Sequence, residues 1–158
     1  MNLKSLLFGG NGTGTILGDA ALALMRLGTG LMIGFGHGMS KVFQPGHFGP
    51  PEQFVQGVAK MGFPAPTLFA WLSALAEFLG GLLIAMGLLT RPAAAMLAFN
   101  MAVAAFITLL HAPFVSMQGP SKESALLYLL PCLLLIATGA GRYSFDFLWR
   151  RSFEQPTG

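Results

Sequence analysis

The run Thr67–Leu89 is apolar or small throughout, except for one carboxylate, Glu77, near its middle. At about 1.5 Å per residue, a helix of this length spans roughly 34 Å, enough to cross the hydrocarbon core of a bilayer, about 30 Å. A charge at that depth costs about 2.5–3.5 kcal/mol to insert, so it normally faces protein or water. The sequence therefore predicts a membrane-spanning helix in which Glu77 has a polar partner.

The composition places the whole chain in a membrane. The 158 residues are 54% hydrophobic and only 9% charged, whereas a soluble domain carries about 25% charged residues. The net charge of +3 is too small and too scattered for nucleic-acid binding and fits loop charges that set topology. Cys132 is the single cysteine of the sequence, which excludes a disulfide within the chain.

Four apolar stretches predict an all-α integral membrane bundle of four transmembrane helices, at about 16–42, 67–89, 93–111 and 123–139. Residues 1–15 are predicted to be a flexible N-terminal segment, residues 16–147 the membrane domain, and residues 148–158 a cytoplasmic tail. Between the first two spans, the stretch Pro51–Met61 has amphipathic spacing and predicts a short interfacial helix, with a plain loop as the alternative.

The basic residues set the expected orientation. With four spans, both termini lie on one side, and that side would hold five Lys or Arg residues against three on the other. The five are Lys4, Arg91, Arg142, Arg150 and Arg151, and the three are Lys41, Lys60 and Lys122. The positive-inside rule then predicts that both termini are cytoplasmic.

Arg26 and Glu77 each lie about ten residues from an end of their spans, and the two spans are antiparallel. Both residues should therefore sit near mid-membrane, and Arg26 is the predicted ion-pair partner of Glu77. Two interpretations of this pair remain open. It is a structural lock between the first two spans, because removing one partner of a buried pair costs about 3–5 kcal/mol, or it is a proton-active site.

Small and polar residues indicate how the helices pack. Gly30 and Gly34 on the first span, and Gly80 and Gly81 on the second, form tracks that allow close helix–helix approach. Asn100 lies near the middle of the third span and is expected to form an interhelical hydrogen bond worth about 0.6–2 kcal/mol.

A second polar group is predicted at the extracytoplasmic ends of the spans. Its members come from three helices and are His37, Lys41, His111 and Glu123. This ring is a candidate binding site for a quinone or another apolar ligand, and a hydrated rim is the alternative. The aromatic residues expected beneath it are Phe35, Phe69, Trp71 and Phe106. Haem bound by the two histidines, and zinc bound by His37, His111 and Glu123, are not favoured because no ligand spacing selects them.

These residues together resemble the DoxX family of small bacterial four-helix membrane proteins over about residues 20–147. The motifs that carry the resemblance are R-x3-G-x3-G-x2-HG-x2-K (Arg26 to Lys41), E-x2-GG-x5-G-x2-TR (Glu77 to Arg91), the Met/Ala-rich segment Met101–Ala105, Glu123, and G-x-G-x2-S-x-D (Gly139 to Asp146). The resemblance implies a bacterial inner-membrane protein. In this family some members are linked to quinone-coupled oxidation or to membrane oxidoreductase complexes, and many have no assigned reaction.

The function expected from the residues and the resemblance is an accessory or quinone-interacting subunit of a membrane redox system. No side chain of the sequence holds an electron by itself, so the protein is at most a subunit of a quinone-linked oxidoreductase. The expected partners are the lipid bilayer and a soluble or membrane redox protein, with a homo-oligomer left open. Two alternatives are a non-catalytic scaffold or assembly factor and a small-molecule permease, the latter weakened by the lack of an inverted repeat.

Overall fold

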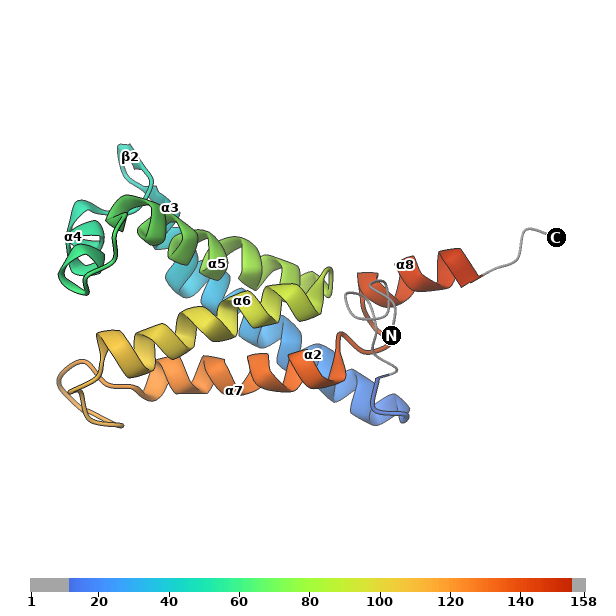
Figure 1. The fold of residues 1–158 in the computed structure, drawn as a ribbon. Coiled ribbons are helices and arrows are strands. Elements are labelled where there is room, and N and C mark those ends of the chain that lie inside the picture. The colour runs from blue at the N-terminus through green and yellow to red at the C-terminus, as the bar shows by residue number, and fades with distance from the viewer. Residues whose placement is uncertain (1–11, 155–158) are drawn as a thin grey trace.

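Long apolar helices lie side by side and form an elongated bundle (Figure 1). The computed structural model describes residues 12–154. The α-helices are α2 (Ile16–Ile33), α3 (Met39–Val42), α4 (Glu52–Lys60), α5 (Pro66–Met86), α6 (Thr90–Val103), α7 (Glu123–Thr138) and α8 (Phe145–Glu154). Two π-helical segments, η1 (Gly34–Gly38) and η2 (Ala104–Thr108), continue α2 and α6, and β1 (Phe43–Gln44) pairs with β2 (His47–Phe48) in a small antiparallel hairpin.

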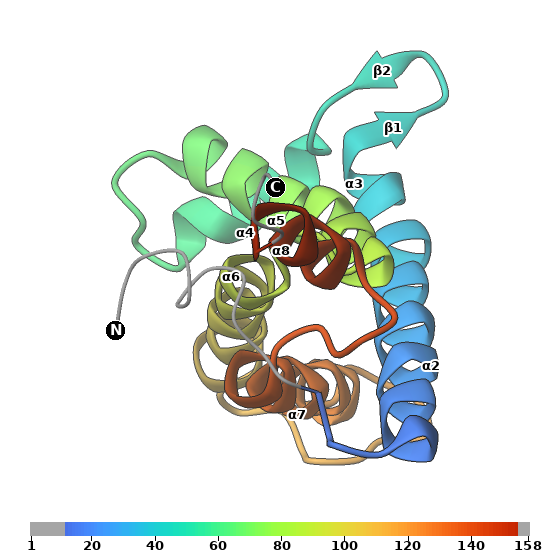
Figure 2. The ribbon, with the colours of Figure 1, turned by 90° about the vertical axis from the view of Figure 1, so that its right-hand side faces the viewer.

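Helix α5 is central to the bundle. It packs against α2 on one side and α6 on the other, and α6 in turn packs along α7, an arrangement visible down the bundle in Figure 2. The hairpin and α4 lie at one end of the bundle, and α8 projects from the opposite end (Figure 1). We refer to these as the α4 end and the α8 end.

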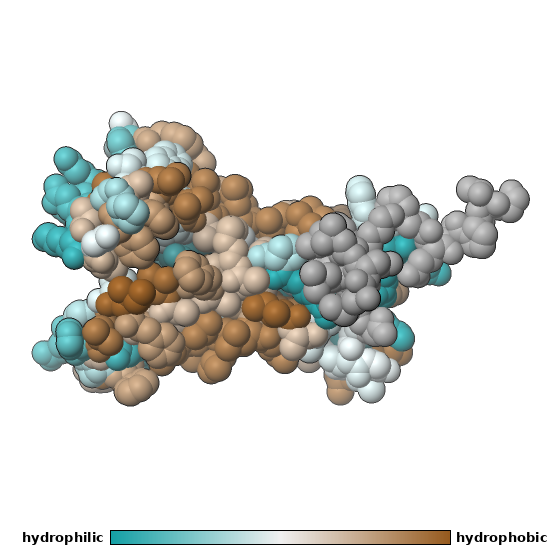
Figure 3. Space-filling view, viewed as in Figure 1, coloured by the Kyte–Doolittle hydropathy of each residue, from teal (hydrophilic) through white to brown (hydrophobic). Residues whose placement is uncertain are grey.

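Large apolar side chains are exposed on α2, α5, α6 and α7. Figure 3 shows a hydrophobic belt between more polar ends, as expected for a protein whose side chains contact lipid. Among the described residues, three helical stretches are long and apolar enough to cross a membrane: Ile16–Val42, Pro66–Met86 and Thr90–Thr108. The prediction of an α-helical membrane bundle is confirmed, with three of the four predicted spans; α7 is apolar but has 16 residues, about 24 Å of helix.

Glycines set the distance and register between α2 and α5. A Cβ atom on Gly30 would meet the carbonyl oxygen of Gly81, and one on Gly81 would lie 2.7 Å from the carbonyl oxygen of Gly30. Gly34 faces the same part of α5, whereas Gly80 faces α6, with the Met96 side chain as its nearest neighbour. The backbones of α2 and α5 therefore touch, as small residues permit in membrane helices.

The α5–α6 connection has three residues, as the predicted spans imply, but it lies at 87–89, three residues earlier than expected. Helix α5 ends at Met86 because Gly87 adopts a left-handed conformation (φ 72°), which glycine tolerates best. Helix α6 begins at Thr90, before the predicted residue 93, because the Asp146 carboxylate accepts hydrogen bonds from the backbone N–H groups of Leu89 (2.7 Å) and Thr90 (2.9 Å). This cap comes from a distant part of the chain and stabilises the helix N-terminus.

The segment between the first two spans contains a helix, α4, where the amphipathic spacing predicts one. Val58 on its inner side is buried, and α4 packs on α5. The hairpin before it was not predicted. Of the predicted flexible segment, residues 1–11 lie outside the described residues, and Thr15 caps α2 by accepting from the Gly18 N–H (3.1 Å). Part of the predicted tail, up to residue 154, belongs to α8.

Candidate functional site

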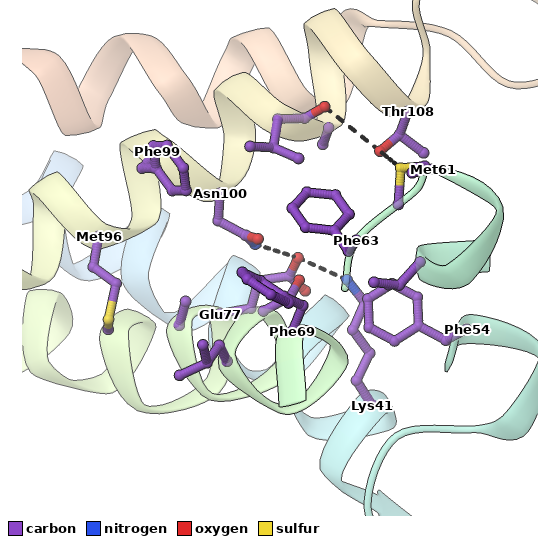
Figure 4. Close-up of a pocket in the computed structure, with 16 residues that line it drawn as sticks. Lys41, Phe54, Met61, Phe63, Phe69, Glu77, Met96, Phe99, Asn100 and Thr108 are labelled. Carbon is purple, nitrogen blue, oxygen red and sulfur yellow. Dashed lines mark hydrogen bonds and ion pairs between the residues drawn. The ribbon is translucent and has the colours of Figure 1, made fainter. Parts of the chain in front are cut away.

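Glu77 lies at the centre of a polar cluster formed by three helical segments. Its Oε1 accepts a hydrogen bond from Lys41 Nζ at 2.6 Å, in an ion pair, and a second from Asn100 Nδ2 at 3.0 Å. The Glu77 side chain is 5% exposed, and that of Lys41 is 26% exposed. Figure 4 shows the carboxylate between the two donors. Asn100 does form the predicted interhelical hydrogen bond, and its acceptor is Glu77.

The predicted Arg26–Glu77 ion pair is wrong. Arg26 Nη1 donates to the carbonyl oxygens of Ile84 and Ala85, at 3.0 Å each, near the end of α5. Its Nη2 donates to the carbonyl oxygen of Tyr143 at 2.6 Å. Contact between Gly30 and Gly81 places Arg26 level with the last turn of α5, about two helical turns from Glu77. The depth of each charge within its own span does not reveal this offset between α2 and α5.

A π-helical segment lies close to Lys41 in the sequence. Because η1 accommodates one more residue per turn than an α-helix, it rotates the residues that follow it relative to α2. Gly38, in η1, packs against the backbone of Phe78, next to Glu77, and Lys41 follows three residues later. The second π-helical segment, η2, follows Asn100 by four residues and contributes Ala104 and Thr108 to the same region. Short π-helical segments are frequent at functional sites.

The polar cluster borders a cavity of about 360 Å³. Its lining is otherwise mostly apolar, from α4, α5, α6 and the connections between them: Phe54, Val58, Met61, Phe63, Phe69, Leu72, Ala76, Met96, Phe99, Val103 and Ala104, with Ser73 and Thr108. Two contacts join the segments that border it at the α4 end. Thr108 Oγ1 lies 3.2 Å from Met61 Sδ, and the rings of Phe63 and Phe69 are 4.7 Å apart.

One oxygen of the cluster has no hydrogen-bond partner. Glu77 Oε2 is buried, and no donor reaches it among the described residues. A buried acceptor without a partner costs about 1–3 kcal/mol, more when charged, and native structures contain few of them. Because Glu77 lines the cavity, a hydrogen-bond donor bound there is suited to fill this vacant position.

The structure does not bring together the four residues of the polar ring predicted at the ends of the spans. Lys41 points to Glu77, whereas the ring of His37 contacts Tyr128 edge-on, with centroids 5.6 Å apart. His111 and Glu123 are exposed, one in the turn after η2 and the other at the start of α7. In residues 12–154, no three His, Cys, Asp or Glu side chains are grouped so as to hold a metal.

Part of the aromatic lining was not predicted: Phe69 was expected beneath the polar ring, whereas Phe54, Phe63 and Phe99 were not expected to line a site. Phe54 comes from the helix interpreted as interfacial and Phe63 from the connection after it, and Lys41 Nζ lies 4.8 Å from the centre of the Phe54 ring. The available signal was the amphipathic spacing of α4, which places Phe54 and Val58 on one side; that side faces the cavity and α5.

An apolar helical bundle with a buried polar cluster defines this chain as a small polytopic membrane protein. A family model described as DoxX matches residues 21–110, and the chain belongs to the DoxX family. It is similar to an uncharacterized membrane protein of Mycobacterium tuberculosis, with 32% identity over 138 residues that cover 82% of this chain and 81% of the relative. No solved structure matches the chain significantly.

Proposed function

We propose that this protein binds a quinone-type molecule in the Glu77 cavity and acts as an accessory or quinone-interacting component of a membrane redox system. The observation that carries the proposal is the cavity itself, an apolar space of about 360 Å³ next to Lys41, Glu77 and Asn100. Small-molecule sites have this character, with a mostly apolar lining and a few placed polar groups.

The size and position of the cavity favour a ring-sized head group with an apolar tail. Its volume is at the lower end of the range for ligand sites, about 300–1,000 Å³. Leu72, Met96 and Phe99 line it and are also exposed on the outside of α5 and α6, Phe99 at 72%. A tail passing these side chains would enter the lipid, which is the environment of membrane quinones.

A redox role requires a second component. No side chain of this chain stores an electron, so electrons would pass between the bound quinone and a partner protein. We place the protein in the bacterial inner membrane with both termini cytoplasmic, which puts Arg91, Arg142 and Arg151 of the α8 end on the cytoplasmic side, as the positive-inside rule expects.

A non-catalytic scaffold is the second candidate function. Helix α8 projects beyond the bundle (Figure 1) and exposes Phe145, Leu148 and Trp149 at spacings of three and four residues. An exposed apolar helix face is suited to contact another protein or the membrane surface. A stoichiometric protein partner that co-purifies without quinone, and is lost when α8 is removed, would favour this candidate.

Filling the cavity tests the quinone proposal. Ala104→Phe places a ring in the cavity wall, and we expect it to abolish binding of a short-chain benzoquinone to the purified protein in lipid nanodiscs. Ala95→Phe is the matched control, because Ala95 is exposed on the same span and does not line the cavity. Equal binding by both variants and the unsubstituted protein would place the ligand elsewhere, and no binding by the unsubstituted protein would refute the proposal.

A further inference from the structure

The two oxygens of Glu77 differ in their hydrogen bonding. Oε1 accepts from Lys41 Nζ and from Asn100 Nδ2, and Oε2, which is also buried, accepts from neither. The cluster therefore satisfies one side of the carboxylate and leaves the other side in need of a donor. Figure 4 shows Glu77 among the side chains that line the cavity.

The charge of the cluster indicates what kind of donor fits. Lys41 already neutralises Glu77 at 2.6 Å, so a cationic ligand would bring an uncompensated charge into a mostly apolar cavity. Burying such a charge is unfavourable unless it is paired. A neutral donor, such as a hydroxyl group, satisfies Oε2 without this cost.

Resting on the proposed function, we infer that the cavity selects the reduced, hydroxyl-bearing form of its ligand, the quinol, over the quinone. A quinol hydroxyl donates to Glu77 Oε2. A quinone presents only carbonyl oxygens, which place lone pairs against lone pairs and leave Oε2 unsatisfied. Sites built to hydrogen-bond a substrate hydroxyl discriminate strongly against analogues that lack it, because a buried protein group is then left unpaired.

Lys41 does not cancel this preference. Its ammonium group has three N–H donors, one of which serves Glu77, so it can also donate to a ligand oxygen. Quinone carbonyls and quinol hydroxyls both accept such a bond, however, and Lys41 therefore does not distinguish them. The discrimination comes from the acceptor at Glu77 Oε2.

The conservative substitution Glu77→Gln replaces the hydrogen-bond acceptor at the Oε2 position with a donor. Lys41 and Asn100 both donate to the Oε1 position, so the amide oxygen of glutamine occupies it and the NH₂ group takes the Oε2 position. A vacant acceptor becomes a vacant donor. The variant should therefore lose the preference for the quinol and favour the quinone, whose carbonyl oxygen can accept.

The test is the affinity of the protein in nanodiscs for a short-chain benzoquinol and for the matching benzoquinone, measured anaerobically. We expect the quinol to bind at least tenfold more tightly, and a tenfold difference raises the midpoint potential of the bound two-electron couple by about 30 mV. Glu77→Gln should reduce the ratio to one or below. Glu123→Gln, at an exposed carboxylate, should leave it unchanged.

A further ligand makes the test independent of any variant. The dimethyl ether of the benzoquinol keeps the ring but has no hydroxyl donor, and it should bind the unsubstituted protein no more tightly than the quinone does. Equal affinities for quinol and quinone, or tight binding of the ether, would overturn the inference and leave the proposed function standing. If neither redox form binds, the proposed function itself fails.

Discussion

Two of the buried charged side chains on α2 and α5, Arg26 and Glu77, have different surroundings. Arg26 donates three hydrogen bonds to backbone carbonyl oxygens, and its guanidinium fills the space that a Cβ on Gly87 would need. Glu77 borders a cavity and keeps a vacant oxygen. Arg26 Nε also lacks a hydrogen-bond partner, but Arg26 does not line that cavity. The comparison indicates that Arg26 holds the α8 end together and that Glu77 is placed to meet a ligand.

Asp146 reinforces this division. It caps α6 through Leu89 and Thr90, its own N–H donates to the Gly87 carbonyl oxygen at 2.8 Å, and Arg26 binds Tyr143 three residues before it. The end of α5, the start of α6 and the start of α8 are therefore joined by hydrogen bonds to the backbone, two of them from the Asp146 carboxylate and three from the Arg26 guanidinium. Such a network fixes helix ends and leaves little room for a ligand.

The largest expected effect is a loss of stability in the Arg26→Met variant. It leaves three carbonyl oxygens without their charged donor, and hydrogen bonds to charged groups contribute about 1.5–3 kcal/mol each. At the lower end of this range, we expect the free energy of unfolding in detergent micelles to fall by about 4–5 kcal/mol. Quinol affinity of the folded fraction should not change, and a stable variant that has lost binding would contradict the division between the two sites.

The next largest loss of stability is expected from Gly30→Ala, with Gly28→Ala on the same helix as its control. Gly30→Ala puts a methyl group against the Gly81 carbonyl oxygen and Ala85, whereas Gly28→Ala meets nothing within 4 Å. Overpacking of this kind costs about 1–3 kcal/mol. Thermal unfolding should show a lower midpoint for Gly30→Ala and not for Gly28→Ala; equal midpoints would mean that the α2–α5 contact is looser than described.

Inserting one alanine after Gly36 tests the role of η1 in orienting Lys41. Because η1 already absorbs one residue beyond α-helical spacing, a second extra residue rotates the following residues by about 100° relative to α2. Lys41 should then leave Glu77, and quinol affinity in a binding titration should fall about tenfold or more. Gly36→Ala is the control, because a Cβ there meets nothing within 4 Å. Unchanged affinity after the insertion would show that Lys41 is dispensable.

The smallest effect is expected from Asn100→Leu. It removes one of the two donors to Glu77 Oε1 but keeps the ion pair with Lys41. Interhelical hydrogen bonds in membranes average about 0.6 kcal/mol, so unfolding should change little, and quinol affinity should fall about threefold. Calorimetric titration beside Asn100→Asp, which keeps the size but exchanges the amide for a carboxyl, separates the lost donor from a change of shape.

The sequence was sufficient to predict what depends on periodicity and composition. The apolar runs predicted the helices, and the isolated carboxylate predicted a polar partner for Glu77. The identity of that partner depended on the relative register of two helices. Aligning Gly30 with Gly81 places residue 85 opposite Arg26, so the glycines carry the register of the two helices, which the depth of each charge within its own span does not.

Other features could not be read from local pattern. The two π-helical segments have no periodic signature over five residues, yet η1 precedes Lys41 and shifts its direction. The cap of α6 by Asp146 joins residues more than fifty positions apart. The lining of the cavity by Phe54 and Phe63 depends on how α4 folds over α5, which is a tertiary contact.

The most direct test of the central claim is the stabilisation that the quinol gives to Arg26→Lys and to Glu77→Gln. A ligand at one hundred times its Kd adds about 2.7 kcal/mol to the free energy of unfolding of a protein that binds it only when folded. At a concentration one hundred times the Kd of the unsubstituted protein, Arg26→Lys should gain this stabilisation in full despite a lower starting stability. Glu77→Gln should gain much less. Equal stabilisation of both variants would show that Glu77 does not bind the ligand, and loss of the effect in Arg26→Lys alone would reverse the roles assigned to the two charges.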